Sequence, residues 1–170
     1  MRVYIKWMKV DVLAVTILSL VLLTNPEVRA AIKNTIIEWY DKYTSIIFKG
    51  QETSDTGAIK EFKFEYIPAG YSESLIEKFG KSTDMEYENG LGDFIYISYW
   101  PDSYSASISI DNENHIIKSE IINGYDAYIA EATNDDFDNG IILSMEGYRF
   151  TLWSKLPTNE LIKIVESITW

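Results

Sequence analysis

Alternating apolar and polar residues, broken by turn sequences, constrain the fold of this chain more than any other feature. In EFKFEYIP at 61–68, apolar side chains fall on every second residue, as in a half-buried strand. Asn-Gly pairs, which favour the tight turns of β-hairpins, stand at Asn89-Gly90 and Asn123-Gly124. From residue 60 onward we therefore expect an antiparallel sheet of roughly six to eight strands.

A helix is expected at the C-terminal end of this region. Pro157 suits a first helical turn. The apolar residues that follow it share one helical face: Leu161, Ile164, Val165 and Ile168. Strands followed by a helix predict the α+β class, with the helix sealing one face of the sheet. Residues 60–170 are thus predicted to form one α+β domain.

The N-terminus is predicted to enter a membrane. Three basic residues precede Val12–Thr24, a run of 13 residues without a charge. A bilayer-spanning helix needs about 20 residues, and extending the run back to Trp7 includes Lys9 and Asp11. The order predicts a signal-anchor or signal peptide over residues 1–25, with membrane contact through residues 7–24. Cleavage after Ala30, and a buried helix of a soluble protein, are the alternatives.

A second, amphipathic helix is predicted over residues 26–50, next to the membrane. Asn25 and Pro26 form a helix start. Apolar residues then recur at spacings of three and four, which is a helical period: Val28, Ile32, Ile36, Trp39, Tyr43 and Ile46. Three readings stay open: a stalk that makes a homodimer through this stripe, a helix lying in the headgroups, and a helix packed on its own domain. Residues 51–59 read as a linker.

The charge distribution bears on location and partners. Residues 1–50 hold seven Lys/Arg and four Asp/Glu, whereas residues 51–170 hold eight and 22, and the net charge is −11. This charge disfavours nucleic acid as a partner. We expect a single-pass protein of the cell membrane with its acidic C-terminal domain outside, or a secreted protein if the N-terminus is cleaved.

Aromatic residues of the predicted sheet are the candidates for ligand binding. Aromatic faces suit sugars and peptides, although alternating aromatics are also what strands ordinarily carry. The candidates are Tyr96, Tyr99, Trp100 and Trp153, with Tyr104 beside them.

No catalytic residue, metal site or cofactor is predicted. The acidic loop NDDFDNG at 134–140 misses the spacing of a calcium-binding EF-hand loop and reads as a solvated hairpin loop with Asn139-Gly140 at its turn. His115 is the one histidine, and the chain has no cysteine. No catalytic motif accompanies His115, so it is expected at the surface.

Four segments combine aromatic strands, turn sequences and the final helix: YIPAGY at 66–71, YENGLGDFIYISY at 87–99, IINGYDAYIAE at 121–131 and YRFTLWSKLPTNELIKIVESI at 148–168. Together they resemble the domain-of-unknown-function (DUF) 4367 family. NPEVRAAIKNTIIEWYDKYTSIIF at 25–48 resembles the segment after the membrane helix in many members. The resemblance implies a Gram-positive, Firmicute-type source and an extracytoplasmic domain on a membrane anchor. Some members carry an anti-sigma-like region on the cytoplasmic side, which we do not expect here because the stretch before Val12 is too short for it.

Function is expected to be binding rather than catalysis. The first expectation is a membrane-tethered sensory or regulatory domain that engages a protein or a cell-wall component. A secreted cell-envelope hydrolase that uses carboxylates and a structural scaffold module of the envelope are the alternatives.

Overall fold

The computed structural model describes residues 35–40, 42–50 and 60–170. In this part of the chain the backbone forms twelve strands and one helix. The strands are β1 (Thr35–Trp39), β2 (Tyr43–Phe48), β3 (Lys63–Phe64), β4 (Tyr71–Phe79), β5 (Ser82–Asn89), β6 (Phe94–Pro101), β7 (Ala106–Asp111), β8 (His115–Ile122), β9 (Tyr125–Ala132), β10 (Asn139–Met145), β11 (Tyr148–Ser154) and β12 (Ile168–Thr169), and the helix is α3 (Thr158–Glu166).

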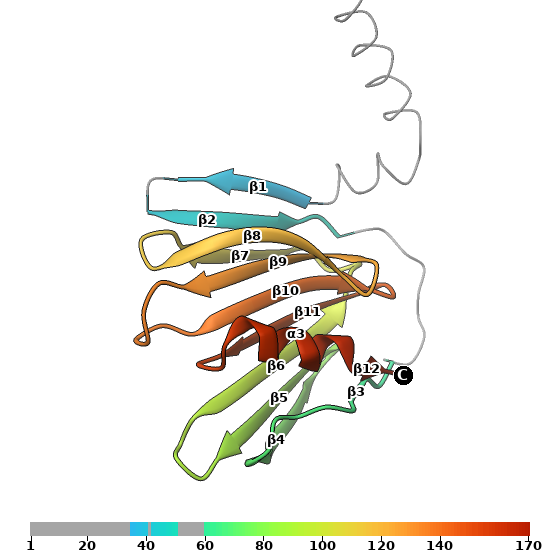
Figure 1. Ribbon diagram of the computed structural model, residues 1–170. Coiled ribbons are helices and arrows are strands. Elements are labelled where there is room, and N and C mark those ends of the chain that lie inside the picture. Colours follow the sequence, from blue (N-terminus) through green and yellow to red (C-terminus); the bar gives the residue numbers. More distant parts are fainter. Residues whose placement is uncertain (1–34, 41, 51–59) are drawn as a thin grey trace, which may run out of the picture.

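Seven of these strands form one twisted antiparallel sheet. Their order is β4-β5-β6-β11-β10-β9-β8, so β4 and β8 are its two edges (Figure 1). β1, β2 and β7 form a second sheet in the order β1-β2-β7, which we call the small sheet, and β12 pairs with β3.

Two of the hairpin turns have the backbone conformation that strand twist demands. Asn123 and Gly124 have φ of 51° and 84°, and Glu146 and Gly147 have φ of 53° and 78°. Positive φ at both central residues is typical of the type I′ turn, which matches the right-handed twist of the flanking strands. The β8–β9 and β10–β11 hairpins therefore close with two-residue turns.

One face of the large sheet is covered by α3, which lies across β10 and β11 in Figure 1. Leu161, Ile164 and Val165 of the helix are almost completely buried. They belong to one apolar cluster with side chains of the sheet, among them Ile141, Leu143, Phe150 and Leu152. Apolar burial of this kind is the main favourable term in folding.

The small sheet covers the opposite face. Ile46 and Phe48 of β2 are buried with Ala130 of β9 and Ile142 of β10 in a second apolar cluster. β10 therefore contributes Ile141 to one cluster and Ile142 to the other, and the domain has three layers.

Arg149 joins the small sheet to the large one. Its side chain is 3% exposed, and its guanidinium donates hydrogen bonds to the carbonyl oxygens of Tyr104, in the β6–β7 loop, and of Lys49, which follows β2. The guanidinium also lies 4.6 Å from the ring centroid of Phe48, a cation–π contact. Burial raises the pKa of the nearby Asp102 carboxyl, and the charge of Arg149 partly offsets this rise.

The predicted α+β class is wrong. The described chain is mostly strand, and α3 is the one helix in this part of the molecule. Two small strand groups accompany the large sheet in place of further helices. The C-terminal helix is present, but it is too short to change the class.

The predicted amphipathic helix over 26–50 is also wrong where the structure describes it. Residues 35–48 form the antiparallel β1–β2 hairpin. β-Branched residues, which favour strands, dominate both arms, and β2 gains a second partner in β7. Ile46 is buried in the core, so it cannot serve a dimer stripe, whereas Trp39 and Tyr43 are exposed near the hairpin tip.

The predicted signal-anchor (1–25), residues 26–34 and the linker (51–59) lie outside the described residues. Within the described ranges, no helix has the length and apolar character needed to cross a membrane.

Replacing Arg149 with Met should detach the small sheet. The substitution leaves the carbonyl groups of Tyr104 and Lys49 without their donor, so we expect the free energy of unfolding to fall by about 1–3 kcal/mol. Urea unfolding measures this loss. Hydrogen exchange should accelerate at β2 amides more than at β10 amides. The exposed Lys63→Met is the control, and equal stability of the two variants would contradict the role given to Arg149.

Candidate functional site

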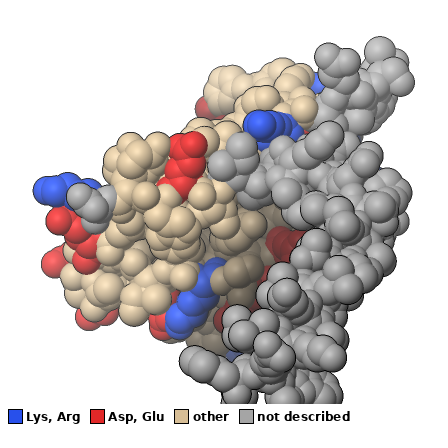
Figure 2. Space-filling model, turned by 90° about the horizontal axis from the view of Figure 1, so that it is seen from above, with Lys and Arg blue, Asp and Glu red and all other residues tan. Residues whose placement is uncertain are grey.

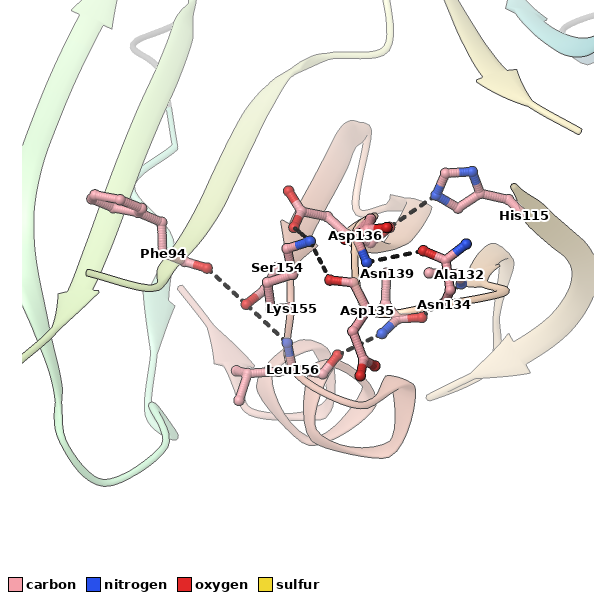
Figure 3. A network of polar contacts seen from close by, with 11 residues as sticks. Phe94, His115, Ala132, Asn134, Asp135, Asp136, Asn139, Ser154, Lys155 and Leu156 are labelled. Atoms are coloured by element: carbon pink, nitrogen blue, oxygen red, sulfur yellow. Dashed lines mark hydrogen bonds and ion pairs between the residues drawn. The ribbon is translucent and has the colours of Figure 1, made fainter. Parts of the chain in front are cut away.

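An open pocket of about 470 Å³ lies beside the loop that joins β9 to β10. Loop residues 133–138 form one wall, and the start of β6 and the end of β11 supply the rest. Its volume is in the range of small-molecule sites. Figure 3 shows the polar contacts around it. The lining residues are Asp93, Ala132, Thr133, Asn134, Asp135, Phe137, Asn139 and Lys155.

Asn139 closes the base of the β9–β10 loop. Its amide nitrogen donates to the carbonyl oxygen of Leu156 at 2.9 Å, and its amide oxygen accepts from the backbone N–H of Ala132 at 2.8 Å. The first bond ties the loop to the segment that leads into α3, and the second closes the loop on the end of β9 (Figure 3). Asn139 and Gly140 begin β10, so the predicted turn at these residues is wrong.

Lys155 holds the outer part of the same loop. Its ammonium group donates to the carbonyl oxygen of Asp135 at 2.6 Å and lies 3.9 Å from a carboxylate oxygen of Asp138. The Asn134 side chain accepts from the backbone N–H of Asp136 at 2.9 Å, which turns the chain inside the loop. The predicted solvated loop is thus ordered by hydrogen bonds.

His115 supports the loop from below. Its Nδ1 lies 3.0 Å from the carbonyl oxygen of Asp111, and its Nε2 lies 3.0 Å from that of Asp138. The ring meets Phe137 and Trp153 edge-on. A catalytic base needs a ring nitrogen directed at its substrate, whereas both nitrogens here face backbone. His115 is therefore a structural link between the β7–β8 turn and the β9–β10 loop, and it is partly buried rather than freely exposed.

The pocket offers mainly hydrogen-bond acceptors. Asp93 accepts one hydrogen bond from the Asn89 side chain at 2.9 Å through Oδ2, and Asp135 brings a second carboxylate. Lys155 is the cation of the lining, and its donors already serve the loop. In the described residues, no group of three His, Asp or Glu side chains is arranged to hold a metal ion. The arrangement suits a small hydrophilic ligand that donates hydrogen bonds.

The structure separates the predicted aromatic residues. Tyr96 and Trp153 face each other across β6 and β11, on the side of the small sheet. Trp100 pairs with Arg149 farther along the same strands. Tyr99 is 2% exposed and belongs to the core under α3. Tyr104 is exposed in the β6–β7 loop, so the five do not form one groove.

Tyr96 and Trp153 do not line the pocket, but they lie on β6 and β11, the strands that are flanked by the pocket residues Asp93 and Lys155. Phe94 stacks on Tyr96 with ring centroids 5.5 Å apart, and Phe94 follows the pocket residue Asp93. A Cβ on Gly140 would overlap the ring of Trp153, so glycine at this position allows the indole to lie flat on β10. The aromatic pair thus extends from the polar pocket along the sheet.

Asp93 and Lys155 are pocket residues that sequence reasoning did not identify. Each stands just outside a strand, in a segment that carries the family resemblance, but neither belongs to a motif that indicates a binding site. The turn signal at Asn89 does bear on Asp93, because the Asn89 side chain accepts from the backbone N–H groups of Leu91 and Asp93, each at 2.9 Å. Placing these residues beside residues 133–139 requires the strand order, which the sequence pattern does not supply.

Seen from above, the described surface is largely uncharged in its centre, with acidic side chains along its rim and a few basic ones (Figure 2).

The fold and the pocket define a small, mainly β domain with an open polar pocket at one end of its large sheet. The chain belongs to the family described as Domain of unknown function (DUF4367), whose model matches residues 61–168. The matched range runs from just before β3 to the first residue of β12, so β1 and β2 of the small sheet precede it. No curated protein and no solved structure matches this chain.

Asp111, in the β7–β8 turn that His115 joins to the pocket loop, should make the stability of the domain depend on acid. Hydrogen bonds from the Asn114 side chain and the Glu113 backbone N–H hold the pKa of Asp111 below its ordinary value of 3.8. A carboxyl whose pKa is lowered by folding stabilises the folded state above its unfolded pKa. That contribution is lost as the pH falls through the lower, folded pKa. Thermal unfolding between about pH 5 and pH 2 should therefore be less pH-dependent for Asp111→Asn. The exposed Asp126→Asn on β9 is the control, and identical pH profiles for Asp111→Asn and the unmodified chain would contradict this assignment.

Proposed function

We propose that this chain is a membrane-tethered extracytoplasmic domain that acts by binding a small hydrophilic ligand in the pocket beside the β9–β10 loop. The single observation that carries the binding role is the pocket itself, whose lining is ordered by hydrogen bonds from three separate segments. Preorganised walls reduce the entropy that a site loses on binding.

The sequence supports the location. Val12–Thr24 carries no charge and follows Arg2, Lys6 and Lys9, the order of an insertion signal. The acidic remainder of the chain suits a soluble domain that stays off an anionic membrane surface. The resemblance of residues 25–48 to the segment after the membrane anchor of DUF4367 proteins supports the same arrangement and a Firmicute-type source.

The acceptors of the pocket define the ligand class. Asp93 and Asp135 favour a ligand with ammonium or hydroxyl donors, since charge-assisted hydrogen bonds are the stronger ones. Phe137 adds an apolar wall on which a sugar ring can lie. A cell-wall fragment with a free amine combines these properties. In a sensory or regulatory role, the domain would pass on the binding of this ligand to a signalling partner.

Membrane attachment is the first test. In a bacterial host the full chain should sediment with membranes after lysis, and protease added to intact protoplasts should remove residues 51–170. We expect this result because the apolar run would insert into the membrane, carry the acidic domain that follows it across, and keep the chain attached. A chain that stays protected in protoplasts and becomes soluble after lysis would contradict the proposed location.

Ligand binding is the second test. The full chain in detergent micelles is titrated calorimetrically with glucosamine oligomers and with N-acetylglucosamine oligomers, which differ in the free amine. We expect the free-amine oligomer to bind more tightly, and Asp93→Asn to weaken it by about tenfold, since a charged hydrogen bond contributes about 1.5–3 kcal/mol.

Asp126→Asn serves as the matched control, because Asp126 lies at the other end of β9 from the loop. Equal affinity of both oligomers for the chain, or an unchanged affinity in Asp93→Asn, would rule out this ligand class.

A further inference from the structure

β8 is an open edge of the large sheet. It pairs with β9 on one side only, and all eight of its residues pair in continuous register, without a bulge. Ile116 and Ile121 are 54% and 73% exposed. A regular edge strand with exposed apolar side chains is a template for pairing with another strand. Figure 1 shows β8 as the last strand of the sheet on the side away from β4.

We propose that β8 pairs with β8 of a second copy of this chain, antiparallel and centred on Ser119. The segment IIKSEII, Ile116–Ile122, is complementary to itself in this register. Lys118 lies opposite Glu120, and Ser119 lies opposite its own copy on the two-fold axis. The remaining pairs are Ile116 with Ile122 and Ile117 with Ile121.

The geometry of the sheet selects this register. A two-fold axis normal to the sheet joins equivalent faces, so opposed residues must differ in number by an even count. In the Ser119-centred register, Lys118 and Glu120 both point to the α3 face, because their partners Ile129 and Ala127 belong to the cluster beneath α3. Moving the centre to Lys118 would place two ammonium groups against each other, and moving it to Glu120 would oppose two carboxylates.

Charge complementarity identifies the strand that pairs with β8 as the β8 strand of a second copy. Edge lysines normally protect against strand addition, and here Lys118 contacts Glu131 of its own β9. The partner in the proposed register offers Glu120 to the same ammonium group, so two opposite-charge cross-strand pairs form across the axis. An unrelated strand would have to match both charges and both isoleucine pairs.

The other edge of the sheet lacks these properties. β4 has a register irregularity between Glu73 and Leu75, and bulges discourage edge pairing. If β4 pairs with itself about Leu75, Glu73 opposes Glu77. The self-complementary edge is therefore specific to β8.

The two-fold axis also places both small sheets on the same face of the joined sheet. The β1 strands of both copies, which follow the N-terminal segments in the chain, then lie on that same face. This point rests on the proposed membrane tether: two chains anchored in one bilayer would meet in the required orientation, and tethering raises their effective concentration.

Cysteine crosslinking tests the register, because the chain has no cysteine of its own. Opposed residues of antiparallel strands have Cα atoms about 4.5–5.5 Å apart, within the range of a disulfide. The full-length Ser119→Cys variant in detergent micelles should form a covalent dimer on mild oxidation. Ser72→Cys, at an exposed position on β4, should form no covalent dimer under the same oxidation.

Charge reversal tests the specificity. Lys118→Glu should raise the dissociation constant of the dimer at least about tenfold, because two attractive pairs become repulsive. Sedimentation in micelles measures this constant. The double variant Lys118→Glu with Glu120→Lys should restore dimerisation. Glu131→Gln, which removes only the ion pair within the chain, should dimerise like the unmodified protein.

Equal crosslinking of Ser119→Cys and Ser72→Cys would overturn the proposal, as would a double variant that remains as weak as Lys118→Glu. Because the assays use micelles, their result does not depend on membrane topology. Release of the chain from membranes on lysis would contradict the proposed tether and leave these measurements unaffected.

Discussion

Burial of β10 and β11 on both faces is the constraint on which the rest of the structure depends. Ile141 and Leu143 face α3, whereas Ile142, between them, faces the small sheet. A strand with apolar residues on both sides requires a cover on each face. α3 provides one cover from the C-terminal end of the chain, and the β1–β2 hairpin with β7 provides the other. The pocket lies where these layers end.

The elements that local chemistry determines could be predicted from the sequence. Turn residues at Asn123-Gly124 indicated a tight hairpin, and the backbone there has the expected positive φ. Pro157 marked the start of the final helix. The prediction for residues 35–48 was wrong, because apolar spacings of three and four are compatible with a helix. The β-branched residues and the pairing of β2 with β7 favour strands instead. That pairing joins residues more than 50 positions apart, which no local pattern encodes.

The candidate site was harder to predict for the same reason. Tyr96 and Tyr99 lie on opposite faces of β6, as strand alternation requires, but alternation does not tell which face meets the core. The acidic loop is conspicuous by its composition, yet its order depends on Asn139, which donates to Leu156, and on His115, which contacts the carbonyl oxygen of Asp138. Sequence alone thus located parts of the pocket wall, and only the strand order brought them together.

The position of β1 has a mechanical consequence. Among the described strands, β1 pairs with β2 alone, and β2 in turn pairs with β7. A pulling force that enters at Thr35 would therefore act first on the β1–β2 ladder, then on β7, and reach the seven-stranded sheet last. The β1–β2 ladder would therefore carry the load before the buried contacts of β2 with the large sheet did.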